Sequence, residues 1–151
     1  FQWEPQISKE EYQRRVKLLR EAITTKTVTY NWHDPDTSFL EAVLARGDRR
    51  MCKVLEAAWR KGAKLDAWEE YFSLERWMEA FDECGLDPHF YANRQREKDE
   101  IMPWSVISSG VTEEYLWREL QRAEAGVTTP DCRTHCNGCG ANHMVGGTCH
   151  V

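Results

Sequence analysis

Four of the six cysteines lie in the last twenty residues, and their thiols are the side chains in this chain best suited to chemistry. Cys132, Cys136 and Cys139 follow a C-x3-C-x2-C spacing, and Cys149 comes later in the same tail. The spacers are small and rich in glycine, so these thiolates can converge on one point without a packed core behind them. Such a cluster predicts a zinc site or an iron–sulfur cluster.

The fourth ligand of this predicted site is open to more than one assignment. Zinc bound by sulfur is tetrahedral and takes four donors. Cys149 is the natural fourth donor, and His135, His143 or His150 could substitute for it. The alternative interpretation is a tail whose thiols bind no metal.

A second candidate site follows a predicted strand near the N-terminus. Residues Lys26–Trp32 alternate between polar and apolar side chains, which predicts a strand. His33 and Asp34 follow it directly, and in a βα barrel the loop after a strand lies on the active face. Glu4 would lie on the same face if Phe1–Trp3 is the end of the preceding strand. A His–Asp pair with a nearby carboxylate could bind substrate or transfer protons.

The same residues also have a purely structural interpretation. Asp34-Pro35-Asp36 is a turn and helix-entry signal, and His33 could serve only in capping or packing.

Three arginines occupy the turn between two predicted helices. Gly47 is expected to end the first helix in a left-handed conformation, and Asp48 is expected to cap the second. The guanidinium groups of Arg46, Arg49 and Arg50 could bind a phosphate or carboxylate of a ligand.

The elements that position these groups are mostly helices. Each predicted helix begins with a capping residue or ends at a glycine. The first expected helix starts at Ser8, and the second covers Phe39–Arg46 after a Ser38–Glu41 capping box. The third follows Asp48 and ends at Gly62, and the fourth extends from Ser73 to Gly85. A short helical turn from Asp87-Pro88 to Tyr91 comes next, and the last helix extends from Thr112 to Gly126.

Composition restricts the function classes. The chain has 151 residues, 30% charged and 41% hydrophobic, which is typical of one globular domain or a fragment of a larger protein. The net charge of −5 argues against a dedicated nucleic-acid binder. No apolar run reaches the roughly 18 residues that cross a bilayer, so we expect no membrane partner. Six cysteines in a Lys/Glu-rich chain favour metal ligation in a reducing, cytoplasmic setting over disulfides.

Several long segments resemble the C-terminal portion of a bacterial radical S-adenosylmethionine (SAM) protein family, in which a cobalamin-binding-like domain precedes the radical SAM barrel. The resemblance covers nearly the whole chain, from Phe1 to Gly140. It rests on Phe1-Gln-Trp-Glu-Pro-Gln6, Asn31-Trp-His-Asp-Pro35, Ser38-Phe-Leu-Glu-Ala42, Ala45-Arg-Gly-Asp-Arg-Arg50, Phe81-Asp-Glu-Cys-Gly-Leu-Asp-Pro88, Phe90-Tyr-Ala-Asn93, Pro103-Trp104, Gly110-Val111, Thr129-Pro-Asp-Cys-Arg133 and Cys136-Asn-Gly-Cys-Gly140.

The resemblance implies a parent enzyme that holds a 4Fe-4S cluster and SAM, with cobalamin as a further cofactor upstream. It implies that the radical-generating cysteines lie before Phe1, in a missing N-terminal barrel that would be the partner of this chain. Radical SAM enzymes hold their four-iron cluster with the same C-x3-C-x2-C spacing, but that motif follows the first barrel strand. The tail cysteines are therefore expected to hold zinc or an auxiliary iron–sulfur cluster. SAM or an unknown substrate would contact the three arginines.

We therefore predict an α/β fragment that is predominantly α-helical. Residues 1–36 would be the last βα unit of a partial TIM-type barrel, because one strand and a remnant cannot form a sheet alone. Residues 37–127 would be a helical extension, and residues 128–151 a Cys-rich metal-binding tail. The fragment would not catalyse a reaction by itself. The alternative function is a small zinc-binding module that docks a protein or RNA.

Overall fold

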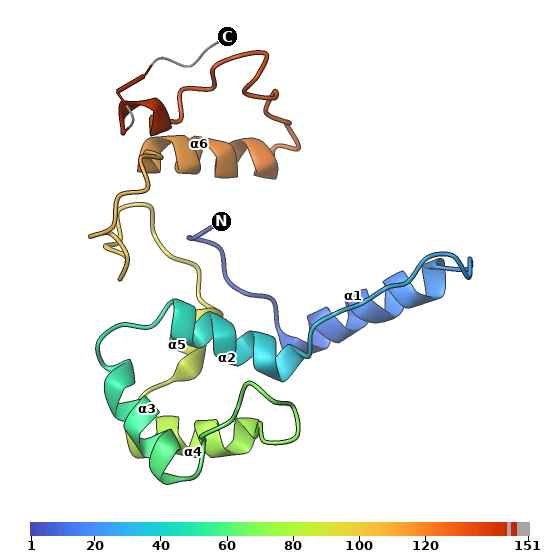
Figure 1. Ribbon diagram of the computed structural model, residues 1–151, viewed down its shortest axis with the longest axis vertical. Coiled ribbons are helices and arrows are strands. Elements are labelled where there is room, and N and C mark those ends of the chain that lie inside the picture. Colours follow the sequence, from blue (N-terminus) through green and yellow to red (C-terminus); the bar gives the residue numbers. More distant parts are fainter. Residues whose placement is uncertain (145, 148–151) are drawn as a thin grey trace. The chain divides into compact units, whose positions relative to one another are not determined.

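The computed structural model describes residues 1–144, 146 and 147, and within them it is helical without any strand (Figure 1). The helices in chain order are α1 (Lys9–Ala22), α2 (Pro35–Ala45), α3 (Met51–Arg60), α4 (Leu74–Glu83), α5 (Pro88–Ala92) and α6 (Glu113–Glu124), followed by the 3₁₀ helix η1 (Ala141–His143).

The predicted βα unit of a TIM-type barrel is wrong. Lys26–Trp32 pairs with no other described segment; the chain after α1 turns back and runs beside that helix (Figure 1). The rings of Tyr30 and Trp32 stack with centroids 5.4 Å apart, and the Arg20 guanidinium lies 5.1 Å from the Trp32 ring. Trp32 therefore contacts α1 through Arg20, while Val28 and Trp32 stay about half exposed, so this alternating segment does not bury one face as a strand of a sheet would.

Most helix starts were predicted correctly from their caps. Ser8, Ser73, Asp87 and Thr112 each accept a hydrogen bond from a backbone N–H in the first turn of the following helix. A cap depends only on residues next to it in the sequence, so these helix starts were predicted correctly although the overall fold was not.

The starts of α2 and α3 are exceptions. Asp48 does not cap α3, which begins at Met51 after Arg50 and has no side-chain cap. Asp34 caps α2 and Pro35 is its first residue, so the predicted Ser38–Glu41 capping box lies inside that helix. Pro35 fixes a helical φ at a position where its missing N–H costs nothing, and Asp34 supplies the side-chain acceptor.

The chain divides into two compact units. The α1–α5 unit is formed by Glu4–Arg96, and the α6 unit is formed by Phe1–Trp3 together with the chain from Glu97 onward.

The α1–α5 unit has a core contributed by four helices. Its most completely buried large side chains are Val43 of α2, Val54 of α3 and Phe81 of α4. Ala58 and Ala80 are also fully buried, so small side chains lie in the core between α3 and α4. Helix α1 contributes no buried residue, which leaves it a peripheral element of this unit.

The α6 unit has a small aromatic core. Trp3 is fully buried and clusters with Met102 and Leu120, with Trp104 and Trp117 packed against them. The Trp104 indole Nε1 donates to Gln2 Oε1 at 2.9 Å. The first residues of the chain are therefore held against α6 and the loop before it, not in a strand.

No helix among the described residues is long and apolar enough to cross a bilayer.

Candidate functional site

The cysteine segment begins with a turn built on Asp131. The Asp131 carboxylate accepts from Arg133 N at 2.9 Å, and its backbone carbonyl accepts from Thr134 N at 3.0 Å and His135 N at 3.3 Å. This turn leaves the side chain of Cys132 exposed to solvent.

Helix α6 holds the segment at two points. Arg118 Nη2 donates to Asn137 O at 2.6 Å, and the Asn137 amide closes the loop by donating to Pro130 O at 2.8 Å. At the start of the helix, Thr112 N donates to Cys139 O at 2.9 Å. The backbone on both sides of Gly138 is thereby tied to one helix.

Glycines allow this docking. Gly138 and Gly140 flank Cys139 and have backbone φ angles of +66° and +90°, which residues with a side chain rarely adopt. A Cβ on Gly140 would lie 2.7 Å from Thr112 Cγ2 and 3.1 Å from Gly110 O. The close approach of the loop to the N-terminus of α6 therefore needs glycine at this position.

A cavity of about 400 Å³ opens beside the middle cysteine of the motif. Its lining residues are Arg118, Arg122, Pro130, His135, Cys136, Asn137 and Gly138. Two arginines and one cysteine therefore line the same cavity, and it is the thiolate form of cysteine that binds metals.

The donor chemistry of the segment fits zinc or an iron–sulfur cluster, but the described side chains are not gathered around one point. Cys132, Cys136 and Cys139 all lie on this surface loop with exposed or half-buried side chains. Within residues 1–144, 146 and 147, no three His, Cys, Asp or Glu side chains are grouped as a metal site. The predicted ligands Cys149 and His150 lie outside the described residues.

The second predicted site is not assembled by the described contacts. Asp34 accepts from Asp36 N and Thr37 N, both at 2.9 Å, so its carboxylate caps α2. The carbonyl of His33 accepts from Tyr12 Oη at 2.7 Å while its ring is exposed.

Glu4, the third residue of that set, lies elsewhere in the α1–α5 unit. Its carboxylate accepts from Gln95 Nε2 at 3.2 Å. No hydrogen bond or ion pair among the described residues joins Glu4 to His33 or Asp34.

The three arginines have separate surroundings. Arg46 donates to Ala92 O at 3.0 Å, and burial lowers the pKa of its guanidinium. Arg50 pairs with Asp48 at 2.6 Å, and its hydrogen bond lowers the pKa of that carboxyl. Arg49 is exposed. Of the three guanidinium groups, that of Arg49 has no hydrogen-bond or ion-pair partner among the described residues, so the turn does not present a three-arginine clamp.

The turn is also not a left-handed helix end. The described glycines with positive φ do not include Gly47. A Cβ there would meet Met51 Cγ at 2.4 Å, so Gly47 is required for close packing between α2 and α3.

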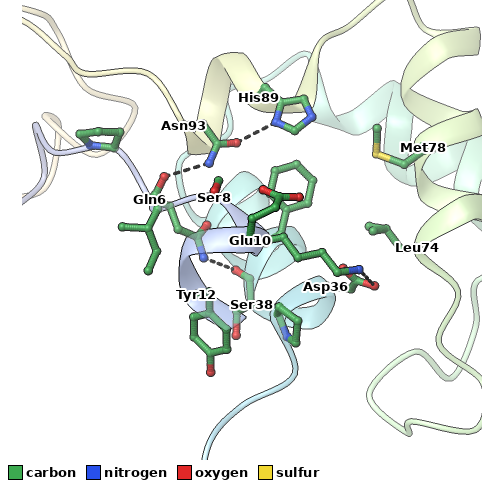
Figure 2. A pocket seen from close by; sticks show the side chains of 15 residues that line it. Gln6, Ser8, Glu10, Tyr12, Asp36, Ser38, Leu74, Met78, His89 and Asn93 are labelled. Carbon is green, nitrogen blue, oxygen red and sulfur yellow. Dashed lines mark hydrogen bonds and ion pairs between the residues drawn. The ribbon is translucent and has the colours of Figure 1, made fainter. Parts of the chain in front are cut away.

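The sequence analysis missed a pocket in the α1–α5 unit. It has a volume of about 560 Å³ and includes His89 and Asn93 of the α5 region (Figure 2). Their spacing of four residues across a short helix was the available signal, but the residues opposite them come from distant parts of the sequence.

Comparisons of the chain with protein-family models, with curated proteins and with solved structures gave no significant match.

Proposed function

We propose that the segment after α6 is a thiolate metal site and that the chain acts as a metal-binding module. The observation that carries the proposal is the docking of the C-x3-C-x2-C loop on α6 through Arg118 and Thr112. This docking restricts the backbone around Cys136 and Cys139, which lowers the entropic cost of bringing their thiolates together. Cys132, and Cys149 or a histidine, would complete the ligand set.

The resemblance to the radical SAM family supports a more specific form of this proposal. The module would then be an accessory, all-helical part of a cytoplasmic radical SAM enzyme, and its metal would be zinc or an auxiliary iron–sulfur cluster. Bound zinc would hold the loop in place, whereas an iron–sulfur cluster would also supply electron transfer. The chain's own residues hold the backbone of the cysteine loop on α6, and Arg118 and Arg122 line the cavity that contains Cys136.

The first experiment measures metal content after purification without oxygen. The full chain is expected to contain about one equivalent of zinc, or iron with sulfide, by elemental analysis. Visible absorption separates the two, because zinc is silent and iron–sulfur clusters absorb. Cys136→Ser and Cys139→Ser are each expected to lose most of the metal.

Cys52→Ser is the matched control, since Cys52 is an exposed cysteine on α3 in the other unit. It should keep the full metal content. Equal metal retention by Cys136→Ser, Cys139→Ser and the control would overturn the ligand assignment. A chain that contains no metal and binds none on reconstitution would overturn the site.

A second experiment addresses the enzyme class. A longer gene product that carries this chain is expected to consume SAM under reducing, anaerobic conditions. The alternative, a zinc module that docks a protein or RNA, predicts metal binding without SAM consumption. Loss of tail metal in Cys136→Ser with unchanged SAM consumption would indicate a structural role for the tail site.

A further inference from the structure

The pocket of the α1–α5 unit is bounded by the start of α1, the start of α2, helix α4 and the α5 region (Figure 2). Its volume of about 560 Å³ lies in the range of small-molecule sites. Phe39, Leu74 and Met78 supply apolar surface, and Pro5 and Ile7 extend it. A ligand with an apolar body of moderate size fits this lining.

A chain of two hydrogen bonds determines which tautomer the neutral His89 ring adopts in this pocket. Asn93 Nδ2 donates to the carbonyl of Gln6 at 2.9 Å, so its Oδ1 faces His89 Nδ1 at 2.8 Å (Figure 2). Because an amide oxygen can only accept, Nδ1 carries the proton of the neutral ring. The other ring nitrogen, Nε2, is then an acceptor. The Phe39 ring packs on the imidazole with centroids 5.0 Å apart.

Three side-chain donors around the pocket are already engaged by acceptors of the protein. Gln6 Nε2 donates to Ser38 O at 3.1 Å, and Lys9 Nζ pairs with the Asp36 carboxylate at 2.6 Å. The hydroxyl of Tyr12 donates to the carbonyl of His33.

Acceptors, in contrast, are left over. Gln6 Oε1 is buried and has no hydrogen-bond partner among the described residues. The Glu10 carboxylate lines the pocket, and among the described residues it forms no ion pair, whereas Lys9 pairs with Asp36. The pKa of Glu10 is lowered by its own backbone N–H and then by the Ser8 hydroxyl, so Glu10 is charged at neutral pH. With Asp36 neutralised by Lys9, the pocket has a residual negative charge.

We propose that this pocket binds a small amine, with its ammonium group at Glu10 and His89 Nε2 and its apolar or aromatic body against Phe39, Leu74 and Met78. The excess of acceptors selects a donor-rich ligand, and the residual negative charge selects a cation over an anion of the same shape. The site lies wholly within the α1–α5 unit, so it is independent of the metal site proposed for the tail.

The test uses NMR titration of the full ¹⁵N-labelled chain with tryptamine, and with indole-3-propionate as an anionic probe of similar size. Tryptamine is expected to shift the amide signals of Ser8, Phe39 and His89 saturably at millimolar concentrations, whereas the acid shifts them little. Equal shifts from both probes, or none from tryptamine, would overturn the proposal.

Variants separate charge from general apolar binding. Glu10→Gln is expected to weaken tryptamine binding by about threefold or more, as is typical for loss of an exposed charge contact. Glu21→Gln makes the same charge change at the far end of α1, outside the pocket, and should leave binding unchanged. His89→Phe keeps an aromatic ring and removes the acceptor, so it should also weaken binding. If Glu10→Gln, His89→Phe and Glu21→Gln all bind as the wild type does, the shifts come from non-specific contact and the proposal fails.

Discussion

Trp3 and Trp117 pack edge to face, with ring centroids 5.0 Å apart and planes at 87°, and this contact joins the first residues of the chain to helix α6. Trp3 is fully buried, and its indole N–H is buried without a hydrogen-bond partner among the described residues. The side chain thus contributes apolar area and ring contact, while its polar atom contributes nothing favourable.

This arrangement predicts different costs for two substitutions. Trp3→Ala is expected to destabilise the α6 unit by about 3–5 kcal/mol, because it removes the largest buried side chain of a small core. Trp3→Phe keeps a ring against Trp117 and removes the unsatisfied N–H, so it should cost clearly less. Urea unfolding followed by circular dichroism measures both. Equal destabilisation by Trp3→Phe and Trp3→Ala would contradict this account of the indole.

The helices could be predicted from the sequence because their signals are short-range. Ser73, Asp87 and Thr112 cap helices with the backbone of the next few residues, and no distant contact is required. The segment Lys26–Trp32 failed for the opposite reason. Alternation describes which side chains share a face, but a strand exists only where another strand pairs with it.

The cysteine loop and the pocket around His89 also differ in how far apart their residues lie in the sequence. The cysteine loop could be proposed as a metal site from the sequence because the spacing of its thiols is local, and metal binding there stays a prediction. The pocket around His89 could not be predicted, because Gln6, Ser38 and Asn93 meet only through tertiary packing.

Asp34 offers a test of capping against charge chemistry. Its carboxylate accepts two backbone N–H groups of α2, so Asp34→Ala should destabilise the α1–α5 unit by about 1 kcal/mol. Asp34→Asn removes the charge and keeps a capping oxygen, and it should cost much less. Both are measured by urea unfolding. A large loss in Asp34→Asn would mean that the negative charge itself matters.

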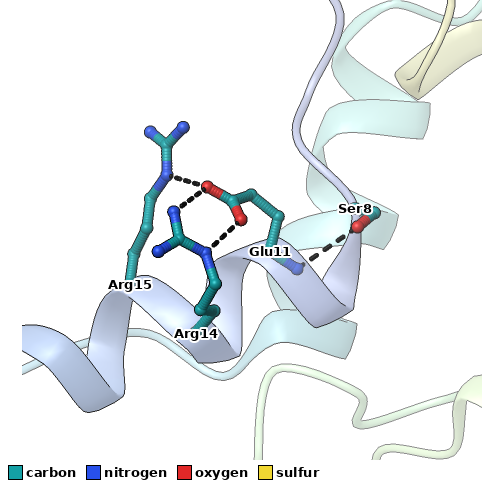
Figure 3. Close-up of polar contacts among 4 residues, drawn as sticks. All are labelled: Ser8, Glu11, Arg14 and Arg15. Carbon is teal, nitrogen blue, oxygen red and sulfur yellow. Dashed lines mark hydrogen bonds and ion pairs between the residues drawn. The ribbon is translucent and has the colours of Figure 1, made fainter.

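The contacts of Glu11 on α1 predict that its contribution to stability depends on pH. Its carboxylate accepts from Arg14 at 2.6 Å and from Arg15 at 2.7 Å (Figure 3). These hydrogen bonds, that of Arg14 first, lower the pKa of Glu11 from 4.5 to about 2. A lowered pKa means that the contribution to stability is complete above pH 4.5 and is lost as the pH falls toward 2.

The measurement is an NMR titration of the Glu11 side-chain carboxyl carbon. In the wild type we expect a midpoint well below 4.5, and in the Arg14→Gln, Arg15→Gln double variant a midpoint near 4.5. The two arginines are exposed, so this double variant should fold normally. If the midpoint is the same in both proteins, the hydrogen bonds of Glu11 with Arg14 and Arg15 are not formed in solution.

Gly140 and Gly62 form a matched pair for testing how the cysteine loop docks. Both have positive φ, +90° and +101°, so Gly→Ala adds similar backbone strain of about 1 kcal/mol at each. They differ in their surroundings, because a Cβ on Gly62 would meet nothing within 4 Å, whereas one on Gly140 would meet Thr112 Cγ2 at 2.7 Å. Gly140→Ala should therefore push the loop from the N-terminus of α6 and expose the Thr112 amide, which now donates to Cys139 O.

Amide hydrogen exchange at Thr112 reads out this contact directly. We expect faster exchange in Gly140→Ala and wild-type exchange in Gly62→Ala. If the docked loop is what brings the thiolates within reach of one another, Gly140→Ala should also bind metal more weakly while keeping every cysteine. Unchanged exchange with weaker metal binding would separate the two effects and show that the glycine acts on the ligands without acting through α6.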